Sequence, residues 1–94
     1  MIEIKNNVAG HLYQAFLDDK AAGACHYKLD GKTITFTHTV VDPAFEGKGV
    51  GSALAKYVLE ESRSRGLKVV PACKFIAAYI SRHSEYQDLV STVL

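Results

Sequence analysis

The sequence predicts an α+β fold in which antiparallel strands are followed by a glycine loop, a helix, a parallel strand and C-terminal helices. Three observations predict this order. Apolar and polar residues alternate through the first half of the chain, as they do in a half-buried strand. Glycines then recur at positions 47, 49 and 51, and after them the apolar residues follow the period of a helix. A short apolar run beyond this helix is expected to be a parallel strand, because the helix crosses over between the two strands.

The first half contains four expected strands. In the first, Ile2 and Ile4 alternate with charged residues. The second is Leu12–Leu17, which ends at a charged run, and the third is Ala22–Leu29. Asp30-Gly31 then predicts a hairpin turn, so the third and fourth strands should pair antiparallel.

The fourth strand, Lys32–Val41, has the clearest pattern. Its alternation places the threonines at 33, 35, 37 and 39 on one face, and on the other Ile34, Phe36, His38 and Val40. The strand is expected to end at Asp42-Pro43, because proline cannot donate a hydrogen bond to a sheet.

The second half is predicted to contain two helices around one buried strand, Leu67–Ala72. The first helix should end at Gly66, and its apolar face consists of Val50, Ala53, Leu54, Tyr57 and Val58. The second helix is indicated by the spacing of Phe75, Ile76, Tyr79, Ile80 and His83. A capping-box pattern, Ser84-Glu85-Tyr86-Gln87, predicts the start of a last short helix.

Length and composition narrow the class of protein. A chain of 94 residues is expected to form one domain, residues 1–94. The net charge of +1, with both signs interspersed, argues against a nucleic-acid-binding protein, which needs a clustered basic face. No apolar run is long enough to cross a membrane, and the N-terminus lacks the order of a secretory signal, so the cytoplasm is the expected location. Cys25 and Cys73 are expected to be free thiols, and no metal site is expected, because no cysteine or histidine pair has ligand spacing.

The three glycines lie directly before the first helix. Glycine lets a backbone approach a ligand closely, and the unpaired amides at a helix start favour an anion. A tight turn without a ligand is the alternative, but three alternating glycines favour phosphate binding. A Walker A loop is excluded because no lysine precedes Ser52. A dinucleotide fingerprint is excluded because the preceding strands form a meander and not a βαβ unit.

Residues 41–54 resemble the cofactor loop of the GNAT superfamily of acetyl-CoA-dependent N-acetyltransferases. The family motif is Gln/Arg-x-x-Gly-x-Gly/Ala between a strand and a helix, and its positions match Glu46, Gly49 and Gly51. The order of elements over residues 32–83 is also similar. Glu46 departs from the usual glutamine or arginine, which leaves the backbone amides to hold the pyrophosphate.

Four sequence blocks, in order, resemble the small single-domain branch of this superfamily. They are His38-Thr39-Val40-Val41, Glu46–Gly51, Pro71–Tyr79 with the pattern Pro-x-Cys-x-Phe-x-x-x-Tyr, and His83-Ser84-Glu85-Tyr86. The chain lacks room for the two helices and the closing strand pair that help GNAT enzymes to bind the acceptor. The resemblance therefore implies a cofactor half with little of the acceptor half.

The resemblance implies a site for acetyl-CoA or coenzyme A. The backbone of Val40 and Val41 would hold the pantetheine where this strand splays from the next. The pyrophosphate would lie against Glu46, Gly47, Lys48, Gly49, Val50, Gly51 and Ser52. Further contacts are expected from Lys74, Tyr79, Arg82 and His83, although these side chains would equally suit the core or the solvated end of a helix.

Three residues are catalytic candidates, each with a structural alternative. Cys73 lies at the expected start of a helix, where the pKa of a thiol can fall, and would take the acetyl group or orient the cofactor; the alternative is a small buried thiol. Tyr79 would protonate the departing thiolate as a general acid, or pack in the core. His38 is a general-base candidate, although a histidine on an apolar face is more often a hydrogen-bonded core residue.

The first hypothesis is therefore an N-acetyltransferase that moves an acetyl group from acetyl-CoA to an amine, directly or through Cys73. The acceptor is not identified by the sequence, and a protein or peptide is one candidate because so little acceptor-binding structure is expected. The second hypothesis is a CoA-binding or acetyl-CoA-binding module without efficient catalysis. The third is a structural domain whose glycine loop is only a turn.

Overall fold

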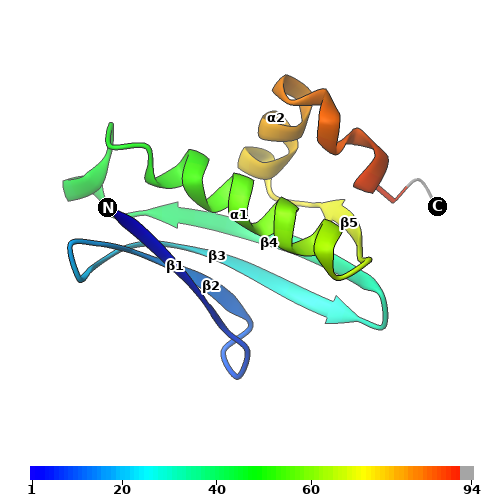
Figure 1. Cartoon of the computed structure of the whole chain (residues 1–94), viewed down its shortest axis with the longest axis horizontal. Coiled ribbons are helices and arrows are strands. Elements are labelled where there is room, and N and C mark those ends of the chain that lie inside the picture. Colours follow the sequence, from blue (N-terminus) through cyan, green and yellow to red (C-terminus); the bar gives the residue numbers. More distant parts are fainter. Residues whose placement is uncertain (92–94) are drawn as a thin grey trace.

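A five-stranded sheet carries two helices and two short 3-10 helices in the computed structural model, which describes residues 1–91 (Figure 1). The strands are β1 (Ile2–Asn7), β2 (Leu12–Leu17), β3 (Lys20–Asp30), β4 (Thr33–Val41) and β5 (Lys68–Pro71). The helices are η1 (Pro43–Phe45), α1 (Val50–Ser64), α2 (Lys74–Arg82) and η2 (Ser84–Leu89). The strand order is β1-β2-β3-β4-β5, antiparallel except for the parallel pair β4–β5. The predicted α+β class and order of elements are confirmed.

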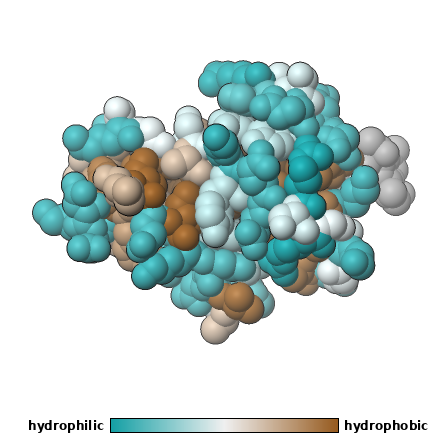
Figure 2. Space-filling model, viewed as in Figure 1, coloured by the Kyte–Doolittle hydropathy of each residue, from teal (hydrophilic) through white to brown (hydrophobic). Residues whose placement is uncertain are grey.

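Both helices lie on one face of the sheet. Helix α1 crosses all five strands, and α2 lies beside it at the β4–β5 end (Figure 1). Their buried side chains share a single apolar core with the strands, to which α1 contributes Leu54 and Val58 and α2 contributes Ile76 and Ile80. The helical side is mostly hydrophilic on its surface, with small separate hydrophobic patches (Figure 2). The side chains on the opposite face of the strands are left without a covering helix among the described residues.

One predicted helix end agrees with the structure and another does not. Gly66 has a positive φ of 67° directly after the C-cap of α1, as predicted. The capping box predicted at Ser84 is wrong. The N-cap residue of η2 is His83, which makes no side-chain capping bond, and Ser84 is already the first residue of this 3-10 helix.

Strand β4 contains a bulge at Thr37. Phe36 pairs with Tyr27 and His38 pairs with His26, so two steps along β4 face one step along β3. An extra residue in one strand turns the side chains that follow it to the opposite face.

The bulge makes the predicted face of His38 wrong. Ile34 and Phe36 are fully buried, as expected, whereas His38 is exposed and Val40 is 53% exposed. Thr39, which was expected on the outer face, turns toward the core and is only partly exposed. Even-numbered residues of β4 therefore face the core before the bulge and the outer side of the sheet after it.

Strands β4 and β5 part halfway along β4. Their pairing ends at Phe36, whose carbonyl also accepts a hydrogen bond of 2.8 Å from the Cys73 amide. Beyond this point β4 continues to Val41, and no described strand lies on its β5 side. The Asp42 amide donates to the Ala22 carbonyl of β3, so the backbone groups of Val41, one residue earlier, point away from β3 into this open edge.

Candidate functional site

The glycine loop joins η1 to α1 and needs glycine for two different reasons. Gly47 and Gly49 have φ values of 82° and 80°, a left-handed conformation that side chains with a Cβ rarely adopt. Gly51 lies in the first turn of α1, where a Cβ would come within 2.8 Å of the Cζ atom of Phe75. The first two glycines therefore shape the loop, and the third allows α2 to approach α1.

The first turn of α1 presents amides without partners. Its N-cap residue, Gly49, has no side chain to accept from them, and the first acidic side chain of the helix comes far beyond the first turn. The amides of Val50, Gly51 and Ser52 precede the first residue that can bond within the helix. The helix dipole adds partial positive charge at the same point, so this turn is suited to an anion.

A cavity of about 320 Å³ lies against this turn. We call it the loop cavity, and it is lined by Val41, Phe45, Glu46, Gly47, Gly49, Val50, Gly51, Ser52 and Phe75. Glu46 and Lys48 are exposed side chains of opposite charge in the loop, and only Glu46 lines the cavity. The open edge of β4 at Val41 and the free amides of α1 thus meet at one cavity.

A second cavity of about 230 Å³ continues from the first, because Ser52 and Phe75 line both. Its other lining residues are Ala78, Tyr79, Arg82 and His83, and we call it the tyrosine cavity. Lys74 is exposed and lines neither cavity. Nine of the predicted binding positions between Glu46 and His83 therefore line one groove. Phe75 lines both of its cavities, and the sequence analysis assigned this residue to a helix but not to the site.

The ring of Tyr79 stacks on that of His83, with centroids 3.9 Å apart and an angle of 14° between the planes. The Nδ1 atom of His83 lies 2.9 Å from the Tyr79 carbonyl oxygen, which fixes the imidazole. Desolvation raises the pKa of the Tyr79 phenol, and the carboxylates of Glu85 and Glu60 raise it further. The phenol is therefore a protonated donor throughout the neutral range.

Cys73 is the N-cap residue of α2, as expected, but its thiol points into the core. The side chain is 6% exposed and lines neither the loop cavity nor the tyrosine cavity. Its Sγ atom lies 3.4 Å from the Thr39 Oγ1 atom, which also contacts the Cys25 Sγ atom at 3.5 Å. Both cysteines are free, as expected. The buried-thiol alternative therefore describes the geometry of Cys73.

His38 stacks on His26 of β3 on the opposite face of the sheet, with ring centroids 4.1 Å apart. Partial burial, and next the proximity of His38, lower the pKa of His26. His26 lines a cavity of about 450 Å³, which we call the outer cavity, with Gln14, Ala21, Ala22, Gly23, Ala24, Val40, Asp42 and Pro43. The sequence analysis missed His26, because its partner depends on the strand register and the bulge.

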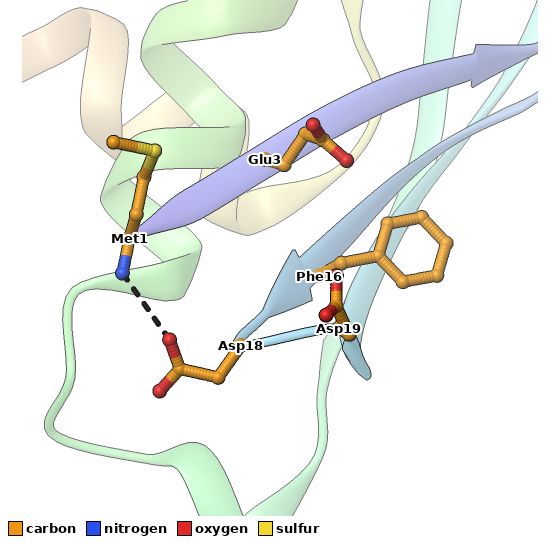
Figure 3. A pocket seen from close by; sticks show the side chains of 5 residues that line it. All are labelled: Met1, Glu3, Phe16, Asp18 and Asp19. Atoms are coloured by element: carbon orange, nitrogen blue, oxygen red, sulfur yellow. Dashed lines mark ion pairs between the residues drawn. The ribbon is translucent and has the colours of Figure 1, made fainter.

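A fourth cavity, of about 220 Å³, lies at the N-terminal end of the sheet. Figure 3 shows its lining side chains, Met1, Glu3, Phe16, Asp18 and Asp19, and the ion pair of 3.6 Å between the Met1 ammonium group and Asp18. Within residues 1–91, no group of three or more histidine, cysteine or acidic side chains could hold a metal ion. No helix of this part of the chain is long and apolar enough to cross a membrane.

Comparison with known proteins identifies one protein family that matches this chain. Residues 7–89 match the family model of the GCN5-related N-acetyl-transferases. A GCN5-like protein from Staphylococcus aureus is similar over 98% of this chain and 90% of its own, with 28% identity and a TM-score of 0.72. A search of curated proteins gives no significant match.

Larger acetyltransferases share the fold. The ribosomal-protein-S18-alanine N-acetyltransferase of Escherichia coli matches with a TM-score of 0.61 and 24% identity over 79% of this chain, and Ard1 of Thermoplasma volcanium with 0.57 and 22% over 66%. This chain covers 49% and 43% of those two proteins, which is about half their length. At such identities the similarity shows the fold alone.

Proposed function

The chain belongs to the GCN5-related N-acetyltransferase family, and we propose that it transfers an acetyl group from acetyl-CoA to a primary amine. One observation carries the proposal. The unpaired amides of the first turn of α1 line a cavity that continues, past Phe75, to the phenol of Tyr79. This groove has anion-binding amides in the loop cavity and a proton donor in the tyrosine cavity, which suits a thioester that carries phosphate groups.

Coenzyme A fits the residues present. Its pyrophosphate would be held by the amides of Val50, Gly51 and Ser52, which have no acceptor within the helix. The open backbone edge at Val41 would pair with the amide-bearing pantetheine arm. Arg82 lines the tyrosine cavity and would meet a further phosphate or the nucleotide.

Bound acetyl-CoA supplies the activated acetyl thioester, and the chain supplies orientation and protons. Backbone donors along the open edge of β4 would polarise the thioester carbonyl as negative charge develops on its oxygen. Tyr79 would give its proton to the sulfur as the thiolate leaves, since its raised pKa keeps the phenol protonated until then. The stack on His83 would hold the phenol in place.

We propose direct transfer to the amine, without an acetylated Cys73. The thiol is 6% exposed, points toward Thr39 and lines neither cavity of the groove. A nucleophile needs its attacking atom within reach of the reacting carbon, which this orientation does not provide. Cys73 is then a core residue at the N-cap position of α2.

A CoA-binding module without efficient catalysis is the second candidate function. It is favoured by the uncovered outer face of the sheet, because a slow or absent acceptor step would follow from weak amine binding. The two candidates share the groove and differ only in turnover.

The test combines binding and turnover. Acetyl-CoA is titrated into the 15N-labelled protein, with pantetheine as a ligand that lacks the pyrophosphate, and thiol release is then followed with a panel of amines. Shifts of the amides of residues 47–52 with acetyl-CoA but not with pantetheine, together with turnover, are expected. Unmoved loop amides would refute both candidates, and loop binding without any turnover would leave only the binding module.

A further inference from the structure

The outer cavity lies on the face of the sheet that carries no helix. Four successive residues of β3, Ala21 to Ala24, line it, and none of them has a side chain of more than one carbon atom. Gln14 of β2 and Val40 of β4 rise on either side of this hollow. The volume of about 450 Å³ is within the range of small-ligand sites.

One strand separates this cavity from the groove proposed for the cofactor. Val40 lines the outer cavity, and the next residue, Val41, lines the loop cavity. Successive side chains of a strand point to opposite faces, so the two cavities lie back to back across β4. Because no described strand pairs with this edge of β4 beyond Phe36, an amine in the outer cavity could reach a thioester bound at the edge from the other face of the sheet.

The outer cavity contains polar groups suited to an ammonium ion, which must lose a proton before the amine can react. Asp42 is the one charged residue among its lining residues, and only one of its carboxylate oxygens, Oδ1, accepts the 2.9 Å bond from the Ala44 amide. His26 lines the wall, backed by the stacked ring of His38 at 4.1 Å. A negative charge that attracts an ammonium group therefore shares the cavity with an imidazole that can take its proton.

The histidine pair favours a neutral His26 before the reaction. Two imidazolium rings at the observed separation would repel each other, which favours the neutral form of His26. His38 from β4 stacks on His26, and the neutral amide of Gln14 from β2 and the Asp42 carboxylate line the same cavity. Burial and His38 lower the pKa of His26, in agreement with this geometry.

We propose that the outer cavity binds the acetyl acceptor as a small aliphatic primary amine, with Asp42 attracting its ammonium group and His26 accepting its proton. This inference rests on the proposed acetyl transfer. A small molecule is favoured over a protein surface because large exposed apolar side chains outside the cavity are separate in sequence: Met1 precedes β1, Val8 follows it and Leu29 lies in β3.

The reaction balances without another reagent. The ammonium group gives one proton to His26, which passes it to water, and the amine nitrogen forms a bond to the acetyl carbon. The carbon–sulfur bond of the thioester breaks, the nitrogen loses a second proton to His26, which again passes it to water, and the sulfur takes the proton of Tyr79. The phenolate is then reprotonated from solvent, so the products are an N-alkylacetamide, free coenzyme A and one proton.

The test uses n-butylamine as the probe, together with a substitution that fills the outer cavity without touching the cofactor groove. Ala24→Ile places a branched side chain in the hollow, and Thr35→Ile is the matched control on the same face, outside the lining residues. Butylamine, and the uncharged 1-butanol for comparison, are titrated into each labelled protein without acetyl-CoA. Amide shifts of residues 21–26 and 40–42 with butylamine alone are expected, and their loss in Ala24→Ile.

Kinetics then separate binding from proton transfer. Ala24→Ile should raise the KM for butylamine by about tenfold or more with KM for acetyl-CoA unchanged. His26→Gln should leave the butylamine shifts in place and lower kcat on the order of 10²-fold. The Thr35→Ile protein should behave as the parent protein in both measurements.

The possible failures are distinguishable. Butylamine shifts that lie elsewhere, or a KM that Ala24→Ile does not change, would overturn the outer cavity as the amine site. If acetyl-CoA binds and a lysine peptide is acetylated but butylamine is not, the small-amine inference is wrong and the proposed acetyl transfer stands. If acetyl-CoA leaves residues 47–52 unmoved, the proposed function fails, while the butylamine titration still decides the cavity.

Discussion

The Thr39 Oγ1 atom lies 3.4 Å from the Cys73 Sγ atom, and this contact joins β4 to the end of β5 beyond the point where the two strands part. The bulge at Thr37 makes it possible, because it turns Thr39 inward. The same hydroxyl contacts the Cys25 thiol at 3.5 Å. A hydroxyl both donates and accepts, so it can serve both thiols at once. The contact gives Cys73 a structural role that does not require acetylation.

Cys73→Ala is therefore expected to keep turnover and to lose stability. Removing the small buried thiol and its contact with Thr39 should cost about 1 kcal/mol of unfolding free energy, measured in urea. Intact mass after incubation with acetyl-CoA should show no acetyl group on the parent protein. Cys25→Ala is the matched control, a second thiol on the same hydroxyl. A loss of about 10²-fold in turnover for Cys73→Ala alone, with acetyl found on Cys73, would instead establish the covalent route.

Gly51→Ala should weaken acetyl-CoA binding more than it weakens the fold. The new Cβ would lie 2.8 Å from Phe75 Cζ, and this ring is 41% exposed, so it can turn aside. The displaced ring would intrude on both cavities of the groove, because Phe75 lines each of them. We expect about a tenfold rise in the Kd for acetyl-CoA with a stability change of about 1 kcal/mol.

The double variant Gly51→Ala/Phe75→Ala provides the control for this mechanism. It removes the ring with which the new methyl group collides. Affinity for acetyl-CoA should then match that of Phe75→Ala alone. An equal loss in both backgrounds would mean that Gly51 acts through its backbone and not through Phe75.

Glu46→Gln is expected to tighten acetyl-CoA binding. Glu46 lines the loop cavity, where its negative charge opposes a pyrophosphate on the neighbouring amides. Because the side chain is exposed and screened, a gain of about threefold in affinity at low salt is expected, shrinking as salt is added. Glu3→Gln, an exposed acid on β1, is the control. Weaker binding by Glu46→Gln would show that the carboxylate contributes a hydrogen bond to the ligand.

The fold could be predicted from the sequence wherever local pattern decides the structure. Ile34 and Phe36 alternate with threonines, and Val50, Leu54 and Val58 follow the helical period, so strand and helix were assigned correctly. The glycines of the loop were also recognisable, since their backbone requirement is local.

The rest depends on contacts between distant residues. The orientations of His38 and Thr39 follow from one extra residue in the pairing of β4 with β3, which a period-2 pattern cannot show. His26 becomes a candidate only when that register places it against His38. The burial of Cys73 likewise depends on Thr39, a residue far away in sequence, and not on its place at a helix start.

Stability should fall in mild alkali because of Cys25. Desolvation raises the pKa of its thiol from 9.0 to about 11, with an opposing hydrogen bond from Thr39 and a raising effect of Cys73. The folded state favours the protonated thiol, so this contribution is complete below pH 9 and disappears as the pH approaches 11. A difference of two units corresponds to about 3 kcal/mol of unfolding free energy. Burial also raises the pKa of Tyr13 to about 12, which extends the decline upward.

Urea unfolding across this pH range measures the effect. Cys25→Ala should be less stable than the parent protein at neutral pH but should lose less stability on going from pH 9 to 11. The comparison therefore concerns the slope with pH and not the absolute stability. Equal slopes in the two proteins would contradict the assignment to Cys25.

Tyr79→Phe should lower kcat without changing the affinity for acetyl-CoA. Phenylalanine keeps the ring that stacks on His83 at 3.9 Å and removes only the hydroxyl group, the proposed proton donor. A loss on the order of 10²-fold is expected, which is the lower end for general acid catalysis. Tyr57→Phe, which changes an exposed tyrosine of α1, is the matched control. Because desolvation raises the Tyr79 pKa above its usual value of 10.0, the midpoint of any decline in the parent kcat through loss of this proton should lie above pH 10. A decline near neutral pH that disappears in Tyr79→Phe would show that Tyr79 loses its proton too early to act as the acid, and an unchanged kcat would show that the departing thiolate takes its proton elsewhere.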